Sequence, residues 1–186
     1  MGVRIERSTP GDVIVEFYRS RNPADPDWLA DTAMFHGHLG PWLVVGALIG
    51  RDAIRRLETP GHWKIDVTCW MPLDKQRTPF SCMLDGLQAS SGATLGKCNI
   101  RFAYSCDVLA SGWPVVHVVR RQDGDRPMEG VHYRATEHLH RFFEGFDPAR
   151  LEELSRQLAQ DDVTRLFDVR AMTDAELSLH RSACTV

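Results

Sequence analysis

Two histidines two residues apart are the first residues in this chain whose types and spacing could do chemistry. His36 and His38 stand between Gly37 and Gly40, and Pro41 follows. Imidazole is a common metal ligand and proton carrier. The glycines permit backbone angles that a Cβ would exclude, and proline suits the first turn of a helix, where its missing N–H is not needed. The pattern predicts a pair of imidazoles at the mouth of a helix; the alternative is an ordinary helix start that contains two histidines.

The segment Gly92-Ala93-Thr94-Leu95-Gly96-Lys97 has a superficial likeness to a phosphate-binding loop. Three residues separate its glycines where that loop has four, and a cysteine follows the lysine where Ser or Thr would bind magnesium. We therefore exclude nucleoside triphosphate binding. Lys97 could still hold an anionic group, and a plain tight turn explains the same residues.

A second group of histidines, His132, His138 and His140, is a poorer metal candidate. His138 and His140 are two residues apart on a predicted helix, so their side chains point to different faces. A metal shared by this group is not expected.

Composition and charge restrict the class of protein. The chain has 186 residues, 43% of them hydrophobic and 25% charged, which is typical of a single globular domain. With 22 basic and 25 acidic residues the net charge is −3, so nothing in the charge indicates a nucleic-acid partner.

The cysteines and the apolar segments indicate a cytoplasmic protein without a membrane segment. No apolar export signal follows the first methionine, and the longest apolar run, 39–50, is too short to cross a bilayer. The five cysteines show no CxxC pairing, so we expect reduced thiols.

Periodicity predicts an α+β domain with helices first, strands in the middle and helices last. The expected helices cover residues 26–35, 41–57, 80–88, 136–143 and 149–160, with a further helical segment after a capping box at 173–176. The expected strands cover residues 13–18, 62–71, 98–104 and 113–121. Gly46 and Gly50, four apart on the second helix, would permit close approach of another backbone.

Three motifs in order resemble the FmdE-like family, which takes its name from formylmethanofuran dehydrogenase. Phe35-His36-Gly37-His38-Leu39-Gly40-Pro41 is similar to that family's F-H-G-H-x-C-P-G opening. Cys82-Met83-Leu84-Asp85-Gly86-Leu87-Gln88 is similar to its C-x-x-D-x-[IL]-Q helix, and residues 92–99 are similar to its G-x-T-x-G-K-x-N loop. The resemblance gives a 25–170 domain, a 1–24 lead-in and a 171–186 helical tail.

The resemblance, not the spacing, brings Cys82 to the histidines. It implies a mixed sheet flanked by helices and a homodimer. It also implies that His36, His38 and Cys82 bind a divalent metal, zinc or a similar ion. The expected ligand-pocket residues are Gly40, Trp42, Asp85, Thr94 and Lys97.

Two departures from the family pattern leave alternatives open. The family's motif cysteine is Gly40 here, and its following glycine is Trp42. The first hypothesis is a small metal-binding protein with an open coordination position, acting on a small molecule in one-carbon or pterin-related metabolism. The second is a metal-free ligand-binding or accessory protein, in which Trp42 helps to fill the vacated pocket. A thiol redox protein based on Cys82 is a third, without a resolving cysteine nearby in sequence. The sequence does not decide whether the protein is an enzyme.

Overall fold

The computed structural model describes residues 20–109 and 112–184, with side chains described as far as residue 180. The predicted strand at 13–18 lies outside the described residues. Within them the chain has the expected α+β fold, with seven α-helices and a mixed sheet of five strands. The helices are α1 (Asp27–His36), α2 (Pro41–Arg56), α3 (Cys82–Ser91), α4 (Glu137–Glu144), α5 (Leu151–Ala159), α6 (Val163–Leu166) and α7 (Asp174–Cys184). None of the helices in the described part of the chain is both long and apolar enough to span a membrane.

The sheet has the strand order β2-β1-β3-β4-β5. The strands are β1 (Ile65–Trp70), β2 (Ile100–Ala103), β3 (Val115–Arg120), β4 (Glu129–Ala135) and β5 (Phe167–Ala171). The β1–β2 pair is parallel and the other pairs are antiparallel. Side chains alternate between the two faces along each strand, so each face has its own set of partners.

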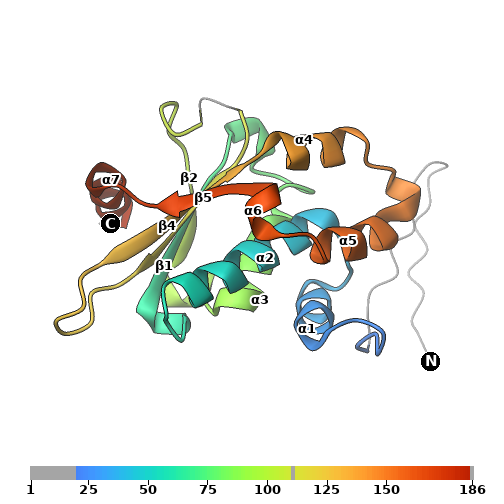
Figure 1. Ribbon diagram of the computed structural model, residues 1–186, viewed down its shortest axis with the longest axis horizontal. Helices are drawn as coiled ribbons and strands as arrows, with labels where there is room; N and C mark the ends of the chain where they lie inside the picture. Colours follow the sequence, from blue (N-terminus) through green and yellow to red (C-terminus); the bar gives the residue numbers. More distant parts are fainter. Residues whose placement is uncertain (1–19, 110–111, 185–186) are drawn as a thin grey trace.

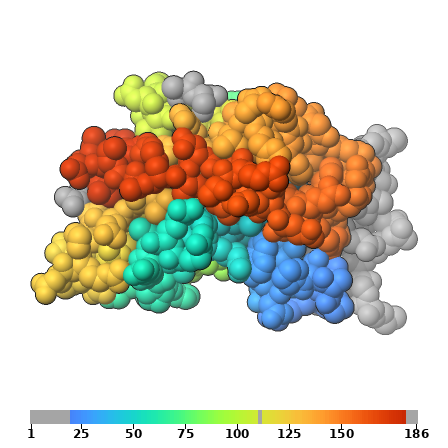
Figure 2. Space-filling model, viewed as in Figure 1, coloured from blue at the N-terminus to red at the C-terminus, as the bar shows by residue number. Residues whose placement is uncertain are grey.

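One face of the sheet builds the main core together with the helices. Val67, Val118 and Val131 are buried there with the apolar side chains of α2. Tyr133 belongs to the same face, and its hydroxyl donates to the buried Asp52 carboxylate of α2 at 2.9 Å. On the outer surface the segment from α4 to α6 lies against α1 and α2 (Figure 2).

The opposite face carries a row of polar residues that crosses the whole sheet. Cross-strand pairing aligns Arg101, Thr68, His117, His132 and Arg170, one from each strand. Helix α7 covers this row, because its His180 contacts Thr68 and its Glu176 contacts His132. The predicted capping box starts α7: Glu176 N–H donates to Thr173 Oγ1 at 3.3 Å, and Thr173 N–H donates to Glu176 Oε2 at 2.8 Å.

Helices α2 and α3 lie side by side below the strands in Figure 1, and glycines let their backbones meet. A Cβ at Gly46 of α2 would stand 2.0 Å from the Met83 carbonyl oxygen. A Cβ at Gly86 of α3 would stand 2.0 Å from the Leu43 carbonyl oxygen. This close packing sets the start of α3 beside the start of α2, where the candidate site residues lie.

We expect Gly46→Ala to destabilise the protein by about 1–3 kcal/mol or more, because the added methyl group would push two helix backbones apart. Gly96→Ala is the matched control, since its Cβ would approach nothing more closely than 4.0 Å. Urea unfolding of both variants measures the difference. Equal midpoints for the two variants would show that the contact between α2 and α3 is not tight.

Strands β4 and β5 were not predicted from the sequence. Residues 129–135 contain Gly130 and three polar side chains, which hide the alternation of a strand. Gly130 is required by packing, because a Cβ there would stand 2.4 Å from Met172 Sδ. Residues 163–169 were interpreted as short and mixed, and they form α6 followed by β5.

Candidate functional site

The two predicted histidines lie at the junction of α1 and α2. Helix α1 ends at His36, and Gly37 follows in the left-handed conformation with φ of 97°, donating its N–H to the Ala33 carbonyl. Pro41 opens α2, as the sequence predicted. Gly40 is extended, with φ of −136°, which any residue can adopt, so of these two glycines Gly37 is the one whose backbone angles require glycine. This tight connection brings the rings of His36 and His38 to a centroid separation of 4.5 Å.

Helix α3 brings Cys82 and Asp85 to the same place. The two residues are three apart at the start of α3, so they share one face of the helix. Asp85 Oδ2 lies 2.7 Å from His36 Nδ1. Cys82 is half-buried and lines a pocket that His38 also lines. Residues from two distant segments of the chain therefore lie close together at this junction.

The surroundings shift the pKa values of the two imidazoles in opposite directions. The hydrogen bond to the Asp85 carboxylate, with a further contribution from the nearby Cys82 side chain, raises the pKa of His36 to about 9. The pKa of His38 is lowered, first by burial and then by the neighbouring His36, against an opposing effect of Glu152. At neutral pH His36 therefore carries a proton that a metal would have to displace, whereas His38 offers a free lone pair.

His36 has the arrangement that metal-binding histidines usually have. Its Nδ1 is bonded to a carboxylate, and its Nε2 is buried without a hydrogen-bond partner among the described residues. Ligating histidines typically donate one ring N–H to a carboxylate, which orients the other nitrogen toward the metal. With a neighbouring imidazole and a thiol, the donor types are those that zinc prefers. The donor types present therefore fit such an ion.

An aromatic pocket of about 290 Å³ opens beside His38 and Cys82. The other residues that line it are Gly40, Pro41, Trp42, Leu43, Pro79, Phe80, Trp113, Phe143, Phe146 and Leu151. Of the five expected pocket residues, Gly40 and Trp42 line this pocket. Asp85 does not line it, and its carboxylate bonds His36 Nδ1 instead.

Thr94 and Lys97 are not among the residues that line the aromatic pocket. Lys97 Nζ lies 3.3 Å from Thr94 Oγ1 and 5.9 Å from the ring of Trp63. Their loop is connected to the histidines indirectly: Leu95 N–H donates to Gln88 Oε1, and Gln88 Nε2 donates to Asp85. The loop thus supports the carboxylate that orients His36.

Comparison with known families identifies the chain. A family model described as "FmdE, Molybdenum formylmethanofuran dehydrogenase operon" matches residues 35–177 of the 186. The chain belongs to the FmdE family. The FmdE match begins one residue before His36 and includes Cys82, the glycine loop and all five strands. Comparison with curated proteins finds no match.

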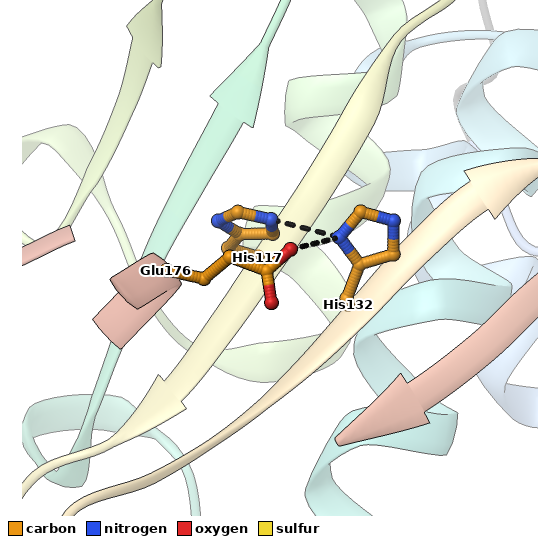
Figure 3. A group of neighbouring side chains, drawn as sticks. All are labelled: His117, His132 and Glu176. Atoms are coloured by element: carbon orange, nitrogen blue, oxygen red, sulfur yellow. Dashed lines mark hydrogen bonds and ion pairs between the residues drawn. The ribbon is translucent and has the colours of Figure 1, made fainter. Parts of the chain in front are cut away.

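The FmdE domain contains a second cluster, which the sequence did not predict. The donor atoms of His117, His132 and Glu176 all lie within 4.8 Å of one another (Figure 3). In the described part of the chain, these three residues are the group of potential metal ligands that meets this distance limit. His36, His38 and Cys82 are not such a group, because their donor atoms do not all lie within this distance of one another. The signal for the second cluster was the cross-strand pairing of His117 with His132, which needed β4 to be recognised.

The hydrogen bonds of this second cluster favour a chain of neutral histidines over a metal centre. Trp70 Nε1 is only a donor and lies 3.0 Å from His117 Nδ1, so the His117 proton is on Nε2. That Nε2 lies 3.0 Å from His132 Nδ1 and donates to it. A metal on His117 Nε2 would have to remove this proton while the indole N–H still occupies Nδ1. The Glu176 carboxylate is already bonded to Arg170 at 2.7 and 2.8 Å.

Proposed function

We propose that this FmdE protein binds a divalent metal ion of the zinc type through His36, His38 and Cys82. The observation that carries the proposal is the buried, unpartnered Nε2 of His36, whose ring is held by Asp85 through Nδ1. Three protein ligands leave one of the four usual zinc positions open. Since His38 and Cys82 also line the aromatic pocket, the open position would face that pocket.

Each residue has a distinct part in the proposed site. Asp85 fixes the ring of His36, and Gln88 in turn bonds Asp85 at 3.2 Å. His38 remains neutral because burial lowers its pKa. The aromatic pocket keeps water away from the open position and holds the ligand. A zinc ion bound here would supply Lewis-acid chemistry or an activated water.

The setting that we propose is one-carbon or pterin-related metabolism in the cytoplasm, with the protein acting as a homodimer. The one-carbon part is supported by the family description, which names a formylmethanofuran dehydrogenase operon. The cytoplasmic part rests on the unpaired cysteines of the sequence. The pterin-related part rests on the family resemblance alone.

A metal-free ligand-binding or accessory protein is the alternative function. It is favoured by Gly40, which stands where the family motif has a thiolate ligand. Trp42 is buried and stacks on Phe143 at a centroid separation of 4.2 Å, so it fills part of the space beside the histidines. In this alternative the aromatic pocket would bind its ligand without a metal.

The double variant His36→Ala, His38→Ala is expected to abolish zinc binding. Protein purified without a histidine tag is stripped with a chelator and titrated with zinc by calorimetry. Wild-type protein should bind one zinc ion, and a free zinc concentration of about 100 times Kd should stabilise it by about 2.7 kcal/mol. The double variant should gain no such stabilisation, because two of the three ligands are gone.

The variant His138→Ala, His140→Ala is the matched control. It removes two imidazoles at the same spacing from α4, where His138 instead bonds Asp161. This variant should keep wild-type zinc stoichiometry. A stoichiometry unchanged by the His36 and His38 replacements, or no stabilisation of wild-type protein by zinc, would decide for the metal-free alternative.

A further inference from the structure

The aromatic pocket has walls of one chemical kind. Five aromatic side chains line it: Trp42, Phe80, Trp113, Phe143 and Phe146. Proline and leucine side chains complete the wall, and among the described residues no Asp, Glu, Lys or Arg lines it. A charged ligand body would lose its hydration there without a partner of opposite charge, which is costly. The body of the ligand is therefore uncharged.

The orientation of the rings favours a flat ligand. Trp42 stacks on Phe143 with an interplanar angle of 17°, and it lies within 24° of parallel to Trp113 at a centroid separation of 6.0 Å. Phe80 presents itself to Trp42 at 64°, with ring centroids 5.2 Å apart. Because Trp42 and Phe143 stack on each other, those two faces are occupied. The aromatic group therefore offers a ligand ring edges and its remaining faces, which suit offset stacking and edge-to-face contact with another aromatic system.

Residues that do not line the pocket hold the Trp113 side chain in place. Lys75 Nζ donates to the Gly112 carbonyl and lies 4.8 Å from the Trp113 ring and 5.9 Å from the Phe80 ring. Trp113 also stacks with the ring of His140, with a centroid separation of 4.2 Å and an interplanar angle of 16°. These contacts hold the indole in place before any ligand arrives, which reduces the ordering cost of binding.

Polar groups gather at one end of the pocket. His38 and Cys82 are the lining residues with side chains able to ligate a metal or accept a hydrogen bond from a ligand head group. The volume of about 290 Å³ lies at the lower limit of ligand pockets, which span about 300–1,000 Å³. The ligand is therefore small and has a single polar end.

We propose that the aromatic pocket binds an uncharged, planar aromatic molecule with a polar substituent that points toward His38 and Cys82. The direction of that substituent rests on the proposed metal function, whereas the class of the ring rests on the pocket walls alone. The anionic group that the sequence assigned to Lys97 has no place in this pocket, because Lys97 lies beside Trp63 instead.

The test compares two probes of equal carbon skeleton by calorimetry. 2-Naphthol is planar and aromatic, whereas decahydro-2-naphthol carries the same hydroxyl on a saturated, puckered frame. Chelator-treated and zinc-loaded proteins are both titrated. We expect 2-naphthol to bind at least tenfold more tightly than decahydro-2-naphthol to either form, and Trp113→Leu to weaken 2-naphthol binding at least tenfold.

Trp63→Leu is the control, because Trp63 is exposed and outside the pocket. It should bind 2-naphthol as the wild type does, and thermal unfolding checks that both variants are folded. Equal affinity for the two probes, or an unchanged affinity in Trp113→Leu, would overturn the proposal and indicate an aliphatic site or none. Zinc binding with no preference for 2-naphthol would contradict this inference alone, whereas 2-naphthol binding without zinc binding would contradict the metal function alone.

Discussion

Gly40→Cys is expected to raise zinc affinity by about tenfold or more. The variant restores the thiolate that the family motif places at this position, and it would convert a three-ligand site into a four-ligand one. Losing even an outer partner of a metal ligand costs about 10–100-fold in affinity, so gaining a direct ligand should have at least this effect.

The backbone conformation and the space around Gly40 allow a cysteine side chain. A Cβ there would stand 3.4 Å from His38 Nε2, which is an ordinary contact and directs the side chain to the histidines. The backbone is extended, with φ of −136°, so a side chain causes no strain. Gly40 also precedes the first turn of α2, and a helix N-terminus favours a thiolate.

Competition with a chromogenic zinc chelator measures the affinity. Gln122→Cys is the matched control, since it adds the same thiol at an exposed position in the β3–β4 turn. Its zinc affinity should equal that of the wild type. If Gly40→Cys binds zinc no more tightly than Gln122→Cys, the proposed ligand set is not at this junction.

Mild acid is expected to destabilise the protein by about 4 kcal/mol between pH 7 and pH 5 through two histidines at the contact between α7 and the sheet. Burial and then the neighbouring His132 lower the pKa of His117 to about 3. Burial also lowers the pKa of His180 to about 4, against an opposing effect of Asp66. Both side chains are almost fully buried, at 0% and 2% exposure, so solvent screens them little.

The sign follows from where each state binds protons. Unfolded histidine has a pKa of about 6.5. Below this pH the unfolded chain binds protons at residues 117 and 180, whereas folded His117 and His180 remain unprotonated, so the unfolded state is favoured. Stability is therefore present above about pH 6.5 and is lost as pH falls toward 4. Each histidine contributes about 2 kcal/mol of this loss by pH 5. His36, with its raised pKa, acts in the opposite sense, and its contribution is lost only as pH rises from about 6.5 to 9.

Urea unfolding at pH 7 and pH 5 in the presence of a chelator measures this loss. His180→Gln is the informative variant, because glutamine can still bond Thr68 Oγ1 but does not titrate. The difference in stability between the two pH values should shrink by about 2 kcal/mol in this variant. The same difference in wild type and variant would show that His180 is not held neutral between α7 and the sheet.

Local signals in the sequence predicted the elements that build the proposed metal site. Gly37, Gly40 and Pro41 end one helix and begin the next, and the structure has α1 and α2 meeting at these residues. Gly46 was expected to permit close backbone approach, and it meets the Met83 carbonyl of α3. Such features depend on the backbone freedom of single residues and can be recognised without the rest of the fold.

Features that depend on pairing between distant strands were not predictable. The polar face of the sheet exists because β4 places His132 opposite His117, and β4 itself was hidden by Gly130 and its polar neighbours. The aromatic pocket joins Trp42, Phe80, Trp113 and Phe143 from four separate segments, and only the fold brings them together. For the same reason Lys97 was expected at the pocket and lies elsewhere.

The most direct test of the proposed metal site is an anomalous difference map at the zinc absorption edge, from crystals of zinc-loaded protein. We predict one strong peak bounded by His36 Nε2, an imidazole nitrogen of His38 and Cys82 Sγ, with zinc–nitrogen distances of about 2.0–2.1 Å and a zinc–sulfur distance of about 2.3 Å. A peak between His117, His132 and Glu176 instead, or a map without a peak at the junction of α1, α2 and α3, would contradict this assignment.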